Sequence, residues 1–258
     1  MNNIKMETIR IRGIEIGAGM PKMCVPIVAE TIEDIIENAR LIAANQPDCI
    51  ELRIDWYENA EDTNQVLQLL QKVRNTIGDI VLLFTFRSKE EGGQKDISVE
   101  DYKHLCESVC ASGYVDLIDV EAYREEGLLQ AMCEMAHRSN VYVVASNHDF
   151  NATPSEGDIV ERLEYMDKMG ADIPKIAVMP NTARDVLNLL SATVAYRERG
   201  GVKPVITMSM SGMGGITRLS GEIFGSAMTF AAVGKNSAPG QYSLLDVREF
   251  LEIIHNSL

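Results

Sequence analysis

A single lysine, Lys175, stands inside the apolar run IPKIAVMP at residues 173–180, which prolines bound on either side. Charged side chains are rarely buried without a partner, so a lysine in such a run needs a physical reason. Where water is excluded, desolvation disfavours the ammonium form and favours a neutral amine, which attacks carbonyl carbons and forms Schiff bases. The competing interpretation is a structural ion pair with an interior carboxylate such as Glu51 or Glu121, and the run alone leaves both open.

A second apolar run, CIELRIDW at residues 49–56, carries charges at every other position. In an extended strand, Glu51, Arg53 and Asp55 therefore share one face, and the apolar residues between them share the other. The apolar face must pack against other elements, which turns the charged face toward an interior. A structural ion-pair network is favoured for Asp55, whereas Glu51 and Arg53 suit either ion pairing or ligand binding.

The same alternation places polar side chains at the ends of three further runs. They are Thr85 and Arg87 in IVLLFTFR, Asp119 and Glu121 in YVDLIDVEA, and Ser146 and His148 in VYVVASNHD. His148 lies at the end of its run and in step with the inward face, which favours a catalytic role. The other histidines, His104, His137 and His255, lack such a position and are interpreted as core or surface residues.

These runs belong to a regular alternation of strands and helices. Short apolar runs, most of them rich in Val and Ile, begin at Cys24, Cys49, Ile80, Tyr114, Val141, Ile173, Val202 and Ala227. The segments between them carry helical periodicity, as at residues 31–45 and 64–78. About eight such units predict an α/β fold with a parallel sheet closed into a (β/α)8 TIM barrel, whose active site lies at the C-terminal ends of the strands. A doubly wound open sheet is the alternative, but it favours a glycine-rich turn where this chain has ETIEDI.

Smaller signals complete the predicted barrel. The segment TIRIRGIEIGAG at residues 8–19 alternates around Gly13 and predicts a β-hairpin that caps one barrel end. SVED at residues 98–101 and SEGD at residues 155–158 are typical of helix starts with a capping hydroxyl.

Two loops with glycine or proline fall at the predicted rim. MSGMGGITRLSGEIFGSA at residues 210–227 suits a loop whose amides approach a ligand, followed by a helix that carries Arg218. GKNSAPGQY at residues 234–242 adds Ser237 and Gln241. Neither loop is specific by itself, because glycine and proline are ordinary loop residues.

Composition limits the classes of partner. The 258 residues are 46% hydrophobic, which suits one barrel domain spanning residues 1–258. Lys and Arg total 24 against 38 Asp and Glu, and the formal net charge of −14 disfavours nucleic-acid and membrane-surface partners. The 5 cysteines form no CxxC pair, so we expect no metal site and reduced thiols. Without an apolar leader at the N-terminus or a run of about 20 apolar residues, a soluble cytoplasmic protein is expected.

Six segments, ELRIDW, TFRSKEEGG, SNHDF, PKIAVM, SMSGMGGITRLSGEIFGSAMTF and SAPGQ, occur in an order and spacing that covers essentially the whole chain. In this respect the chain resembles the type I 3-dehydroquinate dehydratases. The resemblance implies a (β/α)8 barrel, usually a homodimer, that acts without metal or organic cofactor. It also implies a lyase that dehydrates 3-dehydroquinate to 3-dehydroshikimate by syn elimination through a lysine imine, in the third step of the shikimate pathway to aromatic amino acids.

The resemblance also assigns roles to residues. Lys175 is implied as the Schiff-base lysine and His148 as the general acid and base. The acid that orients the histidine is the one directly before the glycine pair of TFRSKEEGG, which selects Glu91 and leaves Glu90 as a solvated neighbour. Arg218 is implied to pair with the substrate carboxylate, a task suited to a bidentate guanidinium. The residues implied to hold the rest of the substrate are Glu51, Arg53, Arg87, Ser237 and Gln241.

Two rival functions share the predicted barrel. A class I aldolase also needs an interior lysine and an imine. Its sugar-phosphate substrates favour amides and lysines at the last loops, whereas this chain offers Arg218 and neutral polar groups there. The second rival is a ligand-binding barrel without turnover, in which the interior charges form a static network.

Overall fold

The computed structural model describes residues 7–234 and 240–258. Its strands are β1 (Ile9–Ile11), β2 (Ile14–Ile16), β3 (Lys22–Ile27), β4 (Cys49–Arg53), β5 (Val81–Thr85), β6 (Leu117–Glu121), β7 (Tyr142–Asp149), β8 (Ile173–Val178), β9 (Ile206–Ser209) and β10 (Met228–Phe230). Its helices are α1 (Ile32–Ala44), α2 (Thr63–Ile77), α3 (Val99–Ala111), α4 (Leu128–Arg138), α5 (Glu156–Lys168), α6 (Ala183–Glu198), α7 (Ile216–Leu219), α8 (Gly221–Phe224) and α9 (Leu244–His255), with short 3₁₀ turns η1 (Ile54–Trp56) and η2 (Lys89–Glu91).

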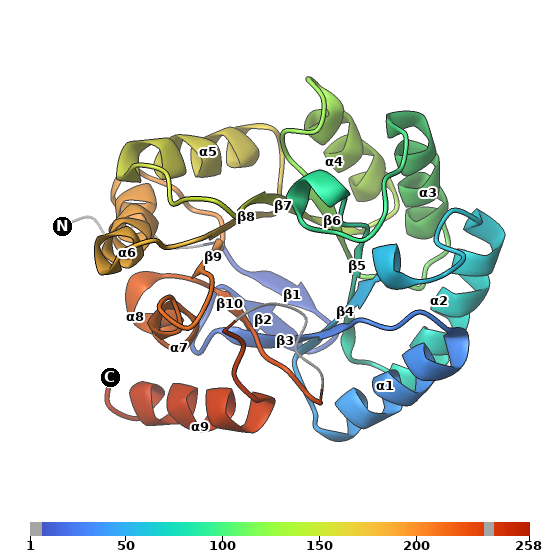
Figure 1. Ribbon diagram of the computed structural model, residues 1–258, viewed down its shortest axis with the longest axis horizontal. Helices are drawn as coiled ribbons and strands as arrows, with labels where there is room; N and C mark the ends of the chain where they lie inside the picture. Colours follow the sequence, from blue (N-terminus) through green and yellow to red (C-terminus); the bar gives the residue numbers. More distant parts are fainter. Residues whose placement is uncertain (1–6, 235–239) are drawn as a thin grey trace.

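The strands from β3 to β10 form a nearly closed parallel barrel. Their order is β10-β3-β4-β5-β6-β7-β8-β9, and helices surround them on the outside (Figure 1). Between β9 and β10, the backbone N–H of Ala227 donates to the carbonyl of Val205 at 2.7 Å, and Val205 pairs with Ser226. The predicted (β/α)8 barrel is therefore confirmed, and the open doubly wound sheet is excluded.

The alternation of residues along the strands separates two apolar layers. One layer lies between the barrel and the helices and includes Ile50 and Leu52 of β4. The other fills the barrel interior and includes Cys49 of β4, Leu83 of β5 and Ile173 of β8. These residues share a face with the interior charges but stand earlier in each strand. The interior is thus apolar toward the amino ends of the strands, whereas its charged side chains lie toward the carboxyl ends, together with apolar residues such as Met208 and Phe230.

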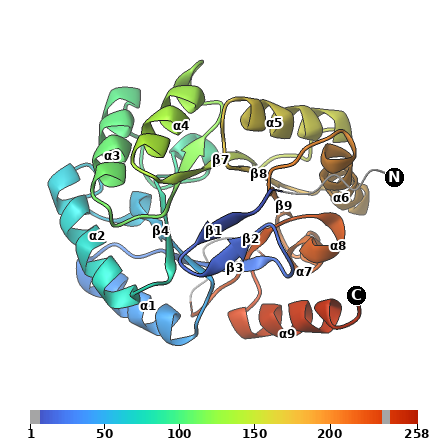
Figure 2. The ribbon, with the colours of Figure 1, turned by 180° about the vertical axis from the view of Figure 1, so that it is seen from behind.

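The predicted hairpin, β1 and β2, closes the amino-terminal end of the barrel (Figure 2). Its isoleucines Ile9, Ile11 and Ile16 pack into the interior apolar layer. The turn residue Arg12 donates to Asp116 at 2.6 Å and to Asp79 at 3.2 Å, which fixes the hairpin to the barrel. The hairpin is therefore a cap, and it lies at the end opposite to the interior charges.

The helix starts predicted from the sequence are confirmed, but one predicted strand boundary is wrong. Ser98 and Ser155 cap their helices as predicted, since their hydroxyls accept the backbone N–H groups of Asp101 and Asp158. The strand predicted over residues 49–56 is too long, because β4 ends at Arg53 and the chain turns through η1. Within the described residues, no helix is both long and apolar enough to cross a bilayer.

Candidate active site

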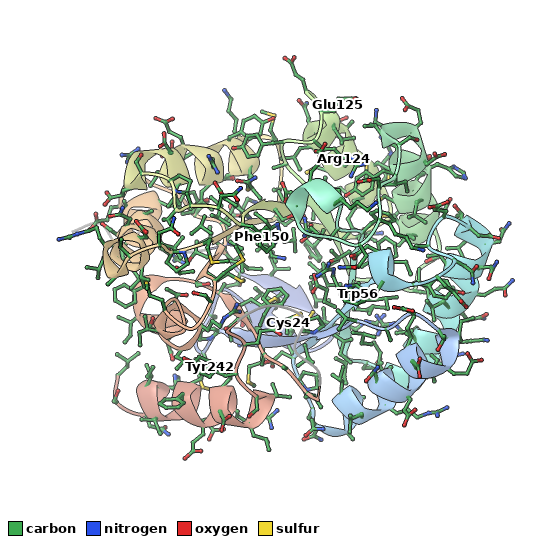
Figure 3. All side chains as sticks on the ribbon, in the orientation of Figure 1. Cys24, Trp56, Arg124, Glu125, Phe150 and Tyr242 are labelled. Atoms are coloured by element: carbon green, nitrogen blue, oxygen red, sulfur yellow. The ribbon has the colours of Figure 1, made fainter. Side chains whose placement is uncertain are left out.

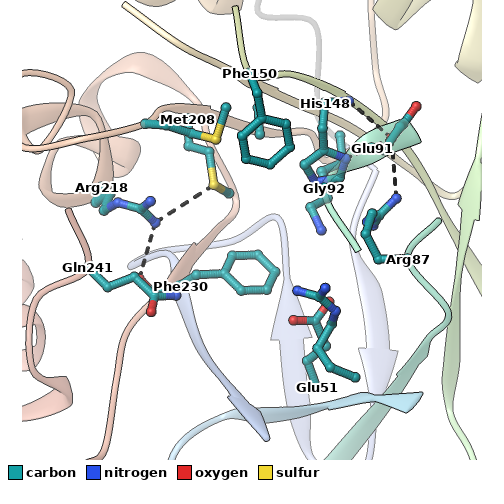
Figure 4. Close-up of a pocket in the computed structure, with 14 residues that line it drawn as sticks. Glu51, Arg87, Glu91, Gly92, His148, Phe150, Met208, Arg218, Phe230 and Gln241 are labelled. Carbon is teal, nitrogen blue, oxygen red and sulfur yellow. Dashed lines mark hydrogen bonds and ion pairs between the residues drawn. The ribbon is translucent and has the colours of Figure 1, made fainter. Parts of the chain in front are cut away.

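A cavity of about 220 Å³ opens at the carboxyl ends of the barrel strands (Figure 4). It is lined by Glu51, Arg53, Arg87, Glu91, Gly92, His148, Phe150, Lys175, Ala177, Met208, Met210, Arg218, Phe230 and Gln241. Every site residue predicted from the sequence is in this set except Ser237, which lies outside the described residues. The strand ends thus bring together side chains that are up to 190 positions apart, from Glu51 to Gln241.

Lys175 stands on β8, is only 3% exposed and points into the barrel. Its Nζ lies 3.1 Å from Oδ2 of Asp119 and 4.7 Å from the centre of the Phe230 ring. The sequence predicts small or thioether neighbours, or else a pair with Glu51 or Glu121. The structure shows a pair with an interior carboxylate, but the partner is Asp119 of β6 rather than Glu51 or Glu121. Ala177 and Met179 lie in the same interior layer as predicted, and the aromatic face of Phe230 is an additional neighbour. The lysine is thus both ion-paired and open to the cavity.

Arg87, just beyond the end of β5, is the centre of a buried ion-pair network. Its guanidinium contacts Asp119 at 2.8 Å, Glu121 at 3.1 Å and Glu91 at 3.3 Å, and it donates to Ser146 at 2.9 Å. Burial alone lowers the pKa of Arg87, but the carboxylates outweigh it and raise the pKa above its ordinary value. Although Arg87 lines the cavity, much of its hydrogen-bonding capacity is already used by the protein.

His148 lies near the end of β7, and its Nδ1 is 2.8 Å from Oε2 of Glu91. Burial, and then the positive charges of Arg87, Lys175 and Arg53, lower the pKa of His148 well below its ordinary value. The imidazole is therefore neutral near pH 7. A neutral imidazole held in this way is a base that faces the cavity.

Glu91 is positioned by the short turn η2. Burial, together with the nearby charges of Glu121 and Asp119, raises the pKa of Glu91 to about 7. Its neighbour Glu90 is exposed, so Glu91 is the acid that contacts His148. The glycine pair that follows allows tight packing, because a Cβ on Gly93 would lie 1.8 Å from the carbonyl oxygen of Arg87.

Arg218, on α7, is 1% exposed and has no ion-pair partner within the described chain. Its NH1 lies 3.7 Å from Sδ of Met208 and 3.4 Å from the carbonyl oxygen of Phe230, while Nε and NH2 have no hydrogen-bond partner among the described residues. Burial lowers the pKa of Arg218 to about 10, which leaves it charged at neutral pH. A buried guanidinium with free donors is a ready site for a carboxylate.

The remaining predicted residues follow the interior face of β4. Arg53 forms two bonds to Asp55, at 2.8 and 2.9 Å, and Glu51 accepts from Thr85 at 2.8 Å. Asp55 is fully buried and also accepts the backbone N–H of Gln94 at 3.1 Å. This geometry agrees with the ion-pair interpretation of Asp55. Asp55 lies in η1, the turn that directly follows the strand.

The glycine-rich loop leads into α7, which carries Arg218 as the sequence predicts. A Cβ on Gly214 would lie 2.1 Å from the carbonyl oxygen of Ser209, and one on Gly215 would lie 2.1 Å from Oη of Tyr242. The absence of a side chain at these glycines therefore allows the loop to pack closely against Ser209 and Tyr242. These glycines precede Arg218, which lines the cavity.

Apolar lining residues were missed by the sequence analysis. Phe150 follows β7, stacks on His148 with 6.4 Å between ring centres, and lies near the barrel axis, whereas Glu125 extends outward (Figure 3). Met208 and Phe230 share the inward face of β9 and β10 with buried apolar residues. Strand alternation would have found these two, but nothing in the sequence distinguishes them from ordinary core residues.

The described residues contain no group of three or more His, Cys, Asp or Glu arranged to hold a metal ion. All 5 cysteines are free and buried. The charged groups of the cavity are instead arranged around an amine, an imidazole and a guanidinium.

The sequence of this chain matches a known protein family and several named proteins. The family model described as Type I 3-dehydroquinase matches residues 23–258. The 3-dehydroquinate dehydratase of Bacillus licheniformis is 46% identical over 250 residues, which cover 97% of this chain and 98% of that protein. The corresponding protein of Clostridioides difficile is 47% identical, with the same coverage of 97% and 98%.

Solved structures agree with the sequence comparison. A type I 3-dehydroquinate dehydratase from Clostridium difficile, solved with covalent modified comenic acid, has a TM-score of 0.95 and 46% identity, with 99% of this chain and 100% of that chain covered. The 3-dehydroquinate dehydratase of Geobacillus kaustophilus has a TM-score of 0.95 and 39% identity, with 98% of each chain covered.

Proposed function

Because this chain belongs to the type I 3-dehydroquinase family, whose members remove water from 3-dehydroquinate, we propose that it does so through an imine on Lys175. The observation that carries the proposal is the meeting of Lys175, His148 and Arg218 in one cavity of about 220 Å³. These groups supply a nucleophile, a base and a carboxylate anchor, which are the parts that this reaction needs.

Substrate binding begins at Arg218. Its free Nε and NH2 donors are matched to the substrate carboxylate in a bidentate pair. Glu51, Arg53 and Gln241 also line the cavity and take the ring hydroxyls, with Ser237 assigned to the same task by the family resemblance. Arg87 acts mainly by holding the acidic network in place, because Asp119, Glu121 and Glu91 engage its guanidinium. The ring is thereby oriented with its ketone toward Lys175.

Imine formation follows from the neutral state of His148. The imidazole accepts a proton from the Lys175 ammonium, and the amine then attacks the C3 ketone to give a carbinolamine. The imidazolium returns that proton to the carbinolamine oxygen, which leaves as water. The product is a protonated imine, in which the nitrogen carries the positive charge.

Elimination uses the same imidazole again. The protonated imine is an electron sink, so the C2 proton becomes acidic enough for neutral His148 to remove. Electrons then flow back from the enamine and expel the C1 hydroxyl, which takes its proton from the imidazolium and departs as water. Hydrolysis of the conjugated imine releases 3-dehydroshikimate and frees Lys175. Glu91 holds the histidine orientation throughout.

The competing functions fit the cavity less well. A sugar-phosphate aldolase needs donors for a dianion, but the cavity presents one unpaired guanidinium, Arg218, among the described residues. A binding protein without turnover needs no neutral base beside the lysine, yet His148 is held in that state.

The proposal also covers the location, cofactors, partners and subunit number of the enzyme. We expect a cytoplasmic enzyme of the shikimate pathway that uses no organic or metal cofactor and binds neither nucleic acid nor membrane. We also expect a homodimer. Ile216, Ile223, Leu245 and Ile253 lie exposed on the adjacent helices α7, α8 and α9, and such apolar side chains suit a subunit contact. Light scattering across a range of protein concentrations measures the subunit number.

The direct test is the absorbance of the conjugated enone product. On addition of 3-dehydroquinate, the native protein should generate this ultraviolet band and Lys175→Ala should not. The variant should remain folded, because Arg87 and Ser146 still hold the buried Asp119 carboxylate that loses its contact with Lys175. Normal turnover by Lys175→Ala, with native circular dichroism, would refute the role proposed for the lysine.

A further inference from the structure

Asp119 contacts the proposed nucleophile but has no role in the steps above. We propose that Asp119 is the counterion of the Lys175 nitrogen before and during catalysis, and that it stabilises the protonated imine. This inference rests on the proposed imine mechanism. It assigns to Asp119 a part in the reaction rather than a static part in the fold.

The carboxylate of Asp119 is held rigidly against Lys175. Oδ2 lies 3.1 Å from Nζ, while Oδ1 accepts from Ser146 Oγ at 2.6 Å and from Arg87 NH2 at 2.8 Å. Asp119 is 1% exposed. With both oxygens engaged and little solvent nearby, the carboxylate has a fixed position, and its attraction to a charge on the nitrogen is little screened by water.

Asp119 is also kept in its charged form. Burial alone raises the pKa of Asp119, but the charges of Arg87 and Lys175 and the Ser146 hydrogen bond outweigh it and lower the pKa. A group with a lowered pKa is a poor proton acceptor at neutral pH. Asp119 therefore acts through its charge, and the proton transfers remain with His148.

Charge conservation explains why one carboxylate serves several steps. An ammonium and a ketone combine to give a protonated imine and one molecule of water, so the nitrogen carries one positive charge both before the reaction and in the imine. The counterion of the ammonium is therefore already in place for the imine. The nitrogen is neutral in the attacking amine, the carbinolamine and the enamine, and in each of these the positive charge is carried by the His148 imidazolium.

Glu121 and Glu51, the other interior carboxylates near the lysine, are engaged elsewhere. Glu121 accepts from Arg87 and Arg124 and from the backbone of Ser88, and Glu51 accepts from Thr85. Among the described residues, Asp119 is the carboxylate that forms an ion pair with Lys175. Glu121 provides a matched control, because it is a buried acid on the same strand and pairs with the same Arg87 but does not contact Lys175.

The experiment compares Asp119→Asn with Glu121→Gln. Native protein and both variants are mixed with 3-dehydroquinate, quenched with borohydride after increasing times, and mapped by mass spectrometry. We expect Asp119→Asn to slow the adduct at residue 175 by about 100-fold, and Glu121→Gln to slow it by less than about 10-fold. Without substrate, acetic anhydride at pH 7 should acetylate Lys175 faster in Asp119→Asn than in the other two proteins, since the ammonium has lost its counterion.

Equal trapping rates in Asp119→Asn and the native protein would overturn the inference. So would equal losses in the two variants together with unchanged acetylation, since that pattern indicates a merely structural role. If Asp119→Asn lacks the native circular dichroism, Ser146→Ala replaces it, because this variant keeps the charge and removes the 2.6 Å hydrogen bond that positions it. Slower trapping in Ser146→Ala supports the inference, and an unchanged rate contradicts it. Absence of any adduct in the native protein would instead refute the imine mechanism itself.

Discussion

Glu91 binds His148 twice through one oxygen. Its Oε2 lies 2.8 Å from Nδ1 of the ring and 3.1 Å from the backbone nitrogen of the same residue. When Glu91 is ionised it accepts the Nδ1 proton in this contact, which leaves Nε2 as the basic nitrogen. The orientation and the tautomer of the base are thus set by a single carboxylate.

Replacing His148 with Ala should separate imine formation from elimination. The amine of Lys175 remains, so 3-dehydroquinate should still become trapped slowly by borohydride. Proton removal from C2 loses its base, and enone formation should fall by roughly 10²- to 10⁴-fold. The two readouts, adduct mass and ultraviolet absorbance, are taken on the same sample. Native rates of enone formation in this variant would exclude His148 as the base.

Replacing Glu91 with Gln should change how stability depends on pH. The pKa of Glu91 is raised from 4.5 to about 7, so the folded protein keeps a proton that the unfolded chain loses between these values. The native protein therefore loses stability as pH rises through this window, and the Gln variant does not. As pH rises from 4.5 to 8, the free energy of unfolding of the variant should increase relative to that of the native protein by on the order of 1–3 kcal/mol.

Glu90→Gln is the control for this titration. Glu90 is the adjacent acid and is exposed, so its substitution should leave the pH dependence of unfolding as in the native protein. Thermal unfolding of the three proteins at several pH values measures both differences. Parallel curves for Glu91→Gln and the native protein would contradict the raised pKa of Glu91.

Replacing Arg218 with Met should weaken catalysis without weakening the fold. The charge of Arg218 is buried without a counterion in the described chain, so its removal should leave stability unchanged or raise it by about 1–2 kcal/mol. Loss of the carboxylate anchor should lower kcat/KM by at least about 100-fold. Denaturant unfolding and steady-state kinetics measure the two effects.

Arg53→Met is the matched comparison for Arg218. It leaves the fully buried Asp55 without its partner and should cost about 3 kcal/mol of stability. A loss of stability in Arg218→Met as large as in Arg53→Met would contradict the idea that Arg218 awaits an anion.

The glycine pair after Glu91 gives a steric prediction. A Cβ on Gly93 would lie 1.8 Å from the carbonyl oxygen of Arg87, so Gly93→Ala must displace backbone beside the site and should cost about 3 kcal/mol or more. In α5, the Gly157 Cβ position is open, with Ser155 Oγ as the nearest atom at 3.9 Å, and Gly157→Ala should stabilise by about 0.5 kcal/mol. Unfolding midpoints compare the two. Equal midpoints would show that the close packing at Gly93 is not required.

The sequence predicts the barrel because about eight apolar runs alternate with helical segments along the chain. Cys49, Glu51 and Arg53 face inward while Ile50 and Leu52 face the helices, and period two is sufficient to assign these faces. The same reasoning brings Lys175 and His148 to one cavity. Period two does not predict where the strand ends. Asp55 lies in η1 after the end of β4, and its carboxylate accepts the backbone N–H of Gln94.

The sequence does not predict which interior acid pairs with which interior base. Asp119, Glu121 and Glu51 are all inward-facing acids, and which one meets Lys175 depends on the stagger of neighbouring strands. That stagger is a property of the closed barrel, and alternation along one strand carries no information about it. Phe150 and Phe230 were missed for another reason, since aromatic residues at strand ends are common in cores.

The imine is tested most directly by reductive trapping and peptide mapping. Native protein is incubated with 3-dehydroquinate, reduced with borohydride and digested, and the peptide that contains residues 173–180 is sequenced by mass spectrometry. We expect one substrate-derived adduct, on Lys175, and none in Lys175→Ala. An adduct on another lysine, or enone production by the native protein with no adduct at all, would contradict the proposal that Lys175 forms the imine.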